Sequence, residues 1–143
     1  MTEETAFART AGARRIGELA GPSLMVLNLI AAVAVFWYGF ESLAAAWQLP
    51  EYSHGPIIPL LSFFMYLREM KSVPPATHPV RDRWVGVLVT AGALLIALVG
   101  LMVRIPDIVT YAFILWVGGT LLVSYGARRG WYFWPSVLHL VFM

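Results

Sequence analysis

The long uncharged apolar runs of the chain constrain its fold more than any other feature. Residues 84–103 (WVGVLVTAGALLIALVGLMV) contain no charged side chain, and residues 24–40 form a second uncharged run. A helix needs about 20 mostly apolar residues to cross a bilayer. With 59% hydrophobic and only 13% charged residues among 143, the chain carries too little charge for the surface of a soluble domain. The sequence therefore predicts a membrane protein, and we expect the lipid bilayer to be one of its partners.

Apolar segments recur along the whole chain, and none alternates with the period of two that a barrel strand requires. We therefore predict an all-α fold, a polytopic transmembrane helical bundle with about five membrane segments, the last of them incomplete. Residues 1–23 are predicted to be a cytoplasmic amino-terminal segment and residues 24–143 the membrane domain. The segments are expected near residues 24–46, 52–67, 84–103, 108–125 and 131–143.

The basic residues predict the orientation of this bundle, because Lys and Arg accumulate in short cytoplasmic loops. If all five segments cross, nine of the ten basic residues lie on one side, namely Arg9, Arg14, Arg15, Arg68, Lys71, Arg81, Arg83, Arg128 and Arg129. Only Arg104 lies on the other side. The amino-terminus is therefore expected in the cytoplasm, and residues 41–53 are expected to face outward.

Composition also excludes several kinds of site. The chain has no cysteine, so these residues hold no disulfide, thiolate metal site or cysteine nucleophile. Its three histidines, His54, His78 and His139, fall on different sides or at different depths of the predicted bundle, so we expect no metal site and no cofactor. No basic patch is interleaved with exposed aromatic residues, so nucleic acid is not an expected partner.

The most polar cluster lies in the stretch LPEYSHGPIIPLL, residues 49–61. The apolar part that follows, residues 56–67, would span only about 18 Å as a helix, against a hydrocarbon core of about 30 Å. We therefore expect Tyr52, Ser53 and His54 to lie below the outer membrane surface, in a cavity walled by other helices, with Gly55 shaping it and Glu51 nearby. Ser53 or Gly55 is predicted to be the N-cap of the short helix.

His54 is the leading functional candidate of this cluster. An ionisable side chain at this depth could bind a polar substrate group or shuttle a proton. The alternative is a purely structural loop in which backbone carbonyls satisfy His54, and the residue types alone leave both open. Two small-residue pairs, Ala93/Ala97 and Gly118/Gly119, could permit close helix contact. His139 lies inside the last apolar segment, and its partner cannot be judged from the sequence.

A family resemblance rests on two stretches of this chain. Residues 47–62 (WQLPEYSHGPIIPLLS) resemble the amino-terminal signature of the exosortase/archaeosortase family, an outward YSHG followed by an apolar helix. Residues 134–143 (WPSVLHLVFM) are similar to the family segment just before its membrane-embedded proline turn. The resemblance covers most of the chain from Trp47 onward.

This resemblance implies a cysteine-type peptidase or transpeptidase of the bacterial inner membrane, often found beside exopolysaccharide genes. Its partner would be an exported protein whose carboxy-terminal sorting tail it cuts. The family's proposed cysteine, arginine and later histidine or arginine lie on downstream helices, and no position in this chain matches them. We therefore expect an inactive amino-terminal part of such an enzyme, with no catalytic residue in this chain. The alternatives are a nucleophile-less relative that binds without cutting, or a noncatalytic transporter subunit or assembly scaffold.

Overall fold

The computed structural model describes residues 30–74 and 82–143, and within these ranges every regular element is a helix. The first is the helix Ile30–Ala46. The others, in chain order, are η1 (Pro50–Tyr52), α2 (Ile57–Met70), α3 (Trp84–Val103), α4 (Pro106–Tyr125), α5 (Ala127–Gly130), η2 (Trp131–Phe133), α6 (Trp134–His139) and η3 (Leu140–Phe142). The all-α prediction is confirmed.

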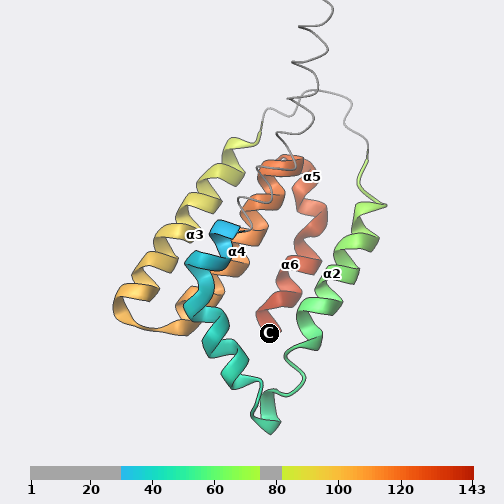
Figure 1. Cartoon of the computed structure of the whole chain (residues 1–143). Coiled ribbons are helices and arrows are strands. Elements are labelled where there is room, and N and C mark those ends of the chain that lie inside the picture. The colour runs from blue at the N-terminus through green and yellow to red at the C-terminus, as the bar shows by residue number, and fades with distance from the viewer. Residues whose placement is uncertain (1–29, 75–81) are drawn as a thin grey trace, which may run out of the picture. The chain divides into compact units, whose positions relative to one another are not determined.

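The chain divides into two units, Met1–Val35 and Phe36–Met143, and the second contains nearly all of the described residues. In that unit, the helical hairpin α3–α4 packs along its length, and α2 packs against α6 (Figure 1). The predicted residues 24–29 of the first segment, together with the predicted cytoplasmic segment 1–23, lie outside the described residues.

Among the described residues, two helices are long and apolar enough to cross a membrane, α3 and α4, each of 20 residues. The helix Ile30–Ala46 and the stretch Pro50–Met70 pass the same test only as a pair bent by 112°. Alone, α2 has 14 residues, which is about 21 Å of helix. The last predicted segment, 131–143, is divided into η2, α6 and η3, and α6 has only six residues. The described residues thus hold two or three candidate spans.

The α3–α4 contact depends on small residues that let the two backbones approach each other. A Cβ added to Gly119 of α4 would lie 2.8 Å from the backbone nitrogen of Thr90 in α3, closer than side chains tolerate. Ala93 and Ala97 of α3 are fully buried. Gly118, in contrast, faces Val137 of α6, so only the second glycine of the predicted pair serves the α3–α4 contact.

A tight turn joins α3 to α4. Arg104 ends α3 in the left-handed conformation with φ of 57°, and the amide of Ile105 donates to the carbonyl of Gly100 at 3.0 Å. Pro106 then begins α4, where its missing amide proton costs no helical hydrogen bond. The hydroxyl of Tyr38 donates to the Arg104 carbonyl at 3.1 Å. This hydrogen bond holds the turn against the helix that carries Tyr38.

Aromatic side chains fill much of the remaining core. Phe36 and Phe40 contact the ring of Phe113 in α4, with ring centroids 5.4 and 4.8 Å apart. On the opposite flank of α4, Phe133 lies between Tyr66 of α2 and Tyr125, at 5.1 and 4.7 Å. Edge and tilted geometries of this kind are the favourable ones for aromatic pairs.

Within the second unit, the helices α2, α3, α4 and α6 alternate in direction, so their termini lie at two ends of that unit (Figure 1). One end holds the end of α2, the start of α3 and α5; there the backbone amide of Arg128 donates to Asp82 Oδ2 at 3.0 Å. The other end holds the loop 47–56, the α3–α4 turn and Met143. Five of the six described basic residues belong to the first end, and only Arg104 belongs to the second.

Candidate functional site

The loop that carries the sequence-predicted site has a defined backbone. Pro50–Tyr52 form a turn of 3₁₀ helix, and the hydroxyl of Ser53 donates to the Pro50 carbonyl at 2.9 Å. The amide of Gly55 donates to Tyr52 at 2.9 Å, and that of Ile57 to His54 at 3.1 Å. Successive turns therefore lead the chain directly into α2.

The predicted N-cap of α2 is wrong. The N-cap position is occupied by Pro56, and no side chain caps the helix. The hydroxyl of Ser53 cannot cap it because that group is already used on Pro50. The physical reason is that residues 53–56 already form a helical turn. The amides of Ile57 and Ile58 donate to backbone carbonyls three residues earlier, so they need no side-chain cap.

Gly55 is the one buried member of the predicted site. A Cβ at this position would overlap the indole ring of Trp47, so the loop can close only over a glycine. The indole Nε1–H of Trp47 in turn donates to the carbonyl of Met143 at 3.4 Å. Gly55 thereby allows Trp47 to join the loop to the carboxy-terminal residue of the chain.

The side chains of Glu51, Tyr52, Ser53 and His54 are exposed, and Tyr52 is 52% accessible. The structure brings these four together on one short turn at the end of the second unit. The described residues do not enclose these side chains. The cavity expected around them therefore remains a prediction, and its other walls would have to come from further residues. The described ranges also contain no group of three or more His, Cys, Asp or Glu side chains arranged as metal ligands.

A polar pair joins α2 to α6, and it was not predicted from the sequence. Ser62 of α2 is only 5% exposed, and its Oγ lies 3.0 Å from Nδ1 of His139 at the end of α6. A buried polar group without a partner is costly, so the two side chains satisfy each other between the helices. The signal available in the sequence was that each is a polar residue inside a short, largely apolar segment.

A second polar pair joins α2 to α4. The hydroxyls of Tyr66 and Tyr125 lie 3.0 Å apart, close to the ring of Phe133. The Ser62–His139 contact joins α2 to α6, and the Tyr66–Tyr125 contact joins it to α4 about one helical turn further along. The short helix that follows the loop is therefore held by specific hydrogen bonds as well as by apolar packing.

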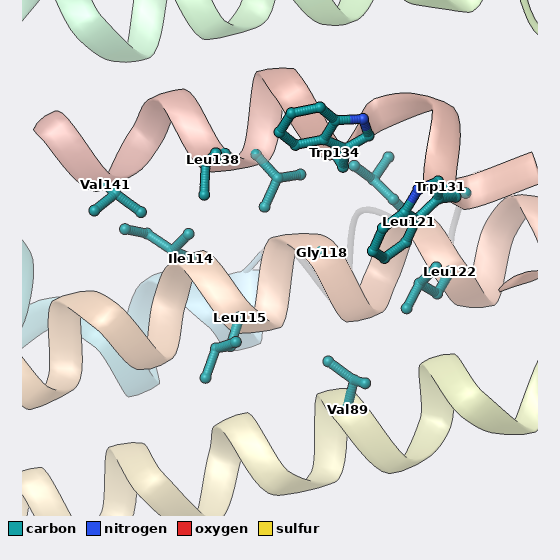
Figure 2. A pocket seen from close by; sticks show the side chains of 12 residues that line it. Val89, Ile114, Leu115, Gly118, Leu121, Leu122, Trp131, Trp134, Leu138 and Val141 are labelled. Carbon is teal, nitrogen blue, oxygen red and sulfur yellow. The ribbon is translucent and has the colours of Figure 1, made fainter.

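A cavity of about 350 Å³ lies between α4 and α6 (Figure 2). Its walls are almost entirely apolar, and none of the residues 51–55 contributes to it. The structure thus separates two features, an exposed polar loop at one end and an apolar groove along the side of the bundle.

Comparison with known proteins identifies the family to which this arrangement corresponds. The model of the family described as Transmembrane exosortase (Exosortase_EpsH) matches residues 46–143. Neither the curated proteins nor the solved structures gave a match. The matched range begins just before Trp47 and includes the loop, the Ser62–His139 pair and both long helices. Because the match covers more than half of the chain, this multi-pass membrane protein belongs to the transmembrane exosortase family.

Proposed function

We propose that this chain forms the amino-terminal part of a membrane cysteine peptidase or transpeptidase, which processes the carboxy-terminal sorting signals of exported proteins. The observation that carries the proposal is the family match over residues 46–143. That range includes the loop Glu51–Gly55, whose polar side chains stand together at one end of the bundle. The loop would form one wall of the site that receives the sorting tail.

The loop offers the groups that such recognition needs. Tyr52 and His54 each carry a hydrogen-bond donor, and both are exposed. A sorting tail of the Pro-Glu-Pro type presents a carboxylate and backbone carbonyls that accept such bonds. Because the chain has no cysteine, the nucleophile would have to come from another stretch of polypeptide. The loop residues therefore position the substrate and do not cut it.

The distribution of charge supports an outward position for this loop. Five of the six described basic residues belong to the opposite end of the bundle. By the positive-inside rule, that end would lie in the cytoplasm and the loop would lie outside, in the bacterial inner membrane that we propose for this chain. The basic cluster that ends a sorting tail would then remain at the cytoplasmic surface, while its Pro-Glu-Pro motif meets the loop.

Site-specific photocrosslinking tests the binding role. Benzoylphenylalanine replaces Tyr52 in the full chain, which is coexpressed with a reporter that carries a Pro-Glu-Pro motif, an apolar span and a basic cluster. We expect a crosslink to the reporter that disappears when alanines replace the Pro-Glu-Pro motif. The matched control places the same amino acid at Trp84, which is similarly exposed and lies at the opposite end.

Two results would contradict the proposal. One is a crosslink at Tyr52 that does not depend on the Pro-Glu-Pro motif, and the other is no crosslink at all in membranes where the chain is stable. Either would favour the noncatalytic scaffold. The catalytic half is tested separately by reading the DNA after codon 143, where the proposal requires an open frame with a cysteine on an apolar helix.

A further inference from the structure

The groove between α4 and α6 has walls suited to hydrocarbon alone. It extends from Ile114 and Val141 at one end to Leu122 and Trp131 at the other, with Val89 of α3 on its side (Figure 2). Gly118 forms part of its floor, so no side chain fills its middle. Its volume is about 350 Å³, and its apolar lining is suited to a hydrocarbon chain.

The Trp131 end of the groove coincides with the basic end of the bundle. Arg128 and Arg129 immediately precede Gly130 and Trp131, which line the groove. The hydrogen bond from the Arg128 amide to Asp82 holds α5 beside the start of α3, where Arg83 is the N-cap residue. Arg83 and Arg128 are exposed there.

The environment of Arg129 differs from that of Arg83 and Arg128. The guanidinium carbon of Arg129 lies 5.9 Å from the ring centroid of Tyr125, on the flank where Tyr125 contacts Phe133. Two exposed arginines, Arg83 and Arg128, thus remain at the same end of the bundle as Trp131, where the groove ends. Trp131, 70% exposed, lies at the same level, and Trp side chains favour the membrane–water interface.

We propose that this groove binds an anionic phospholipid, with one acyl chain between α4 and α6 and its phosphate held by Arg83 and Arg128. Basic pockets at the cytoplasmic ends of membrane helices recognise anionic head groups, and arginine forms paired hydrogen bonds with phosphate oxygens. The apolar walls alone would accept any lipid tail, so the selectivity comes from the two arginines. The lipid site is separate from the loop Glu51–Gly55 and does not depend on its proposed role.

Tryptophan quenching by brominated lipids tests this site in the full chain. The protein is reconstituted in phosphatidylcholine nanodiscs that contain a minor fraction of lipid brominated on its acyl chains. We expect brominated phosphatidylglycerol to quench more strongly than brominated phosphatidylcholine at the same fraction. The excess should fall in Trp131→Phe and be lost when Trp134→Phe is added, because both tryptophans line the groove.

Paired variants separate the head-group contact from general charge. Arg128→Gln should weaken the preference for phosphatidylglycerol about fivefold, the effect expected of one basic residue at an anionic surface. The hydrogen bond to Asp82 uses the Arg128 backbone, so it is retained in this variant. Arg104→Gln removes the same charge at the other end of the bundle and should leave the preference unchanged.

A second pair tests the groove itself. Gly118→Leu should fill the groove and abolish the excess quenching, whereas Gly92→Leu on α3 should not, because a Cβ at Gly92 meets nothing within 4 Å. Equal quenching by the two lipids would overturn the proposal, as would a Gly118→Leu protein that keeps the preference. If Gly118→Leu fails to fold, the comparison of Arg128→Gln with Arg104→Gln decides alone.

Discussion

Gly55 shows how a single residue determines the shape of the candidate site. Its missing side chain makes room for the Trp47 indole, which reaches the Met143 carbonyl. We predict that Gly55→Ala displaces Trp47 and lowers the free energy of unfolding by about 1–3 kcal/mol, the usual cost of overpacking. Thermal unfolding in detergent, followed by tryptophan fluorescence, measures this change.

Gly92→Ala is the matched control, since a Cβ at Gly92 meets nothing. In an open position within a helix the change from glycine to alanine should stabilise the protein by about 1 kcal/mol. If Gly55→Ala were as stable as Gly92→Ala, the contact between Gly55 and Trp47 would have no structural importance.

The Ser62–His139 contact leads to a second prediction about single residues. Ser62→Ala leaves Nδ1 of the half-buried His139 without its partner, and we expect a loss of about 1–3 kcal/mol. In a double-mutant cycle with His139→Phe, the coupling energy should be about 0.6 kcal/mol and at most about 1.7 kcal/mol, the average and the maximum found for hydrogen bonds between membrane helices. Ser124→Ala is the control, because the Ser124 hydroxyl bonds only to Thr120 of its own helix. A coupling energy near zero would contradict a direct hydrogen bond between Ser62 and His139.

The site could be predicted only in part, for reasons visible in these residues. The polar cluster at 51–55 was evident because it interrupts apolar sequence, and Gly55 was expected only to shape the cavity or to cap the helix. The partners of Gly55 and Ser62 lie 8 and 77 residues away. The Ser62 pairing depends on how α2 meets α6, which no local pattern specifies. Whether the loop is enclosed remains a prediction, since the described residues leave it exposed.

Among the elements, the α3–α4 hairpin depends most clearly on small residues. Gly119 lies against the backbone of Thr90, while its neighbour Gly118 faces the side chain of Val137 at an ordinary 3.4 Å. We predict that Gly119→Ala costs about 1–3 kcal/mol through strain between two backbones. Gly118→Ala, the same change one residue away, should be neutral or stabilising. Unfolding in a denaturing detergent compares them, and equal stability of the two variants would contradict the close approach of α3 and α4.

Helix boundaries were predicted well where the composition of the sequence alone determines them. The helix α3 begins at Trp84 and ends at Val103, as predicted, because charged residues flank an uncharged run. The helix α4 begins two residues earlier than predicted, because Pro106 suits a first helical position. The prediction differs most from the structure at residues 131–143, where one expected segment is divided into η2, α6 and η3. The short helix expected within residues 56–67 is present as α2.

For the whole molecule, the open question is how the bent pair of helices around the loop lies in the membrane. The helix Ile30–Ala46 and the stretch Pro50–Met70 meet at 112°, and together they are long and apolar enough for one broken span or a re-entrant loop. The five-segment prediction requires instead that each of them crosses. The three arrangements differ in where they place residues 53 and 72. Two crossings put Ser53 outside and Ser72 in the cytoplasm, whereas a single broken span puts Ser72 outside. A re-entrant loop leaves Ser53 within the membrane.

Two crossings agree best with the charges, because a broken span would place Arg68 and Lys71 outside, against the positive-inside rule. The chain has no cysteine, so Ser53→Cys and Ser72→Cys each give a single thiol, and both serines are exposed. We predict that a membrane-impermeant maleimide labels Ser53→Cys in intact cells and labels Ser72→Cys only after permeabilisation. Labelling of Ser72→Cys from outside would contradict the orientation. Failure of Ser53→Cys to react on either side would indicate a re-entrant loop, and the loop Glu51–Gly55 could then meet a sorting tail only inside the bilayer.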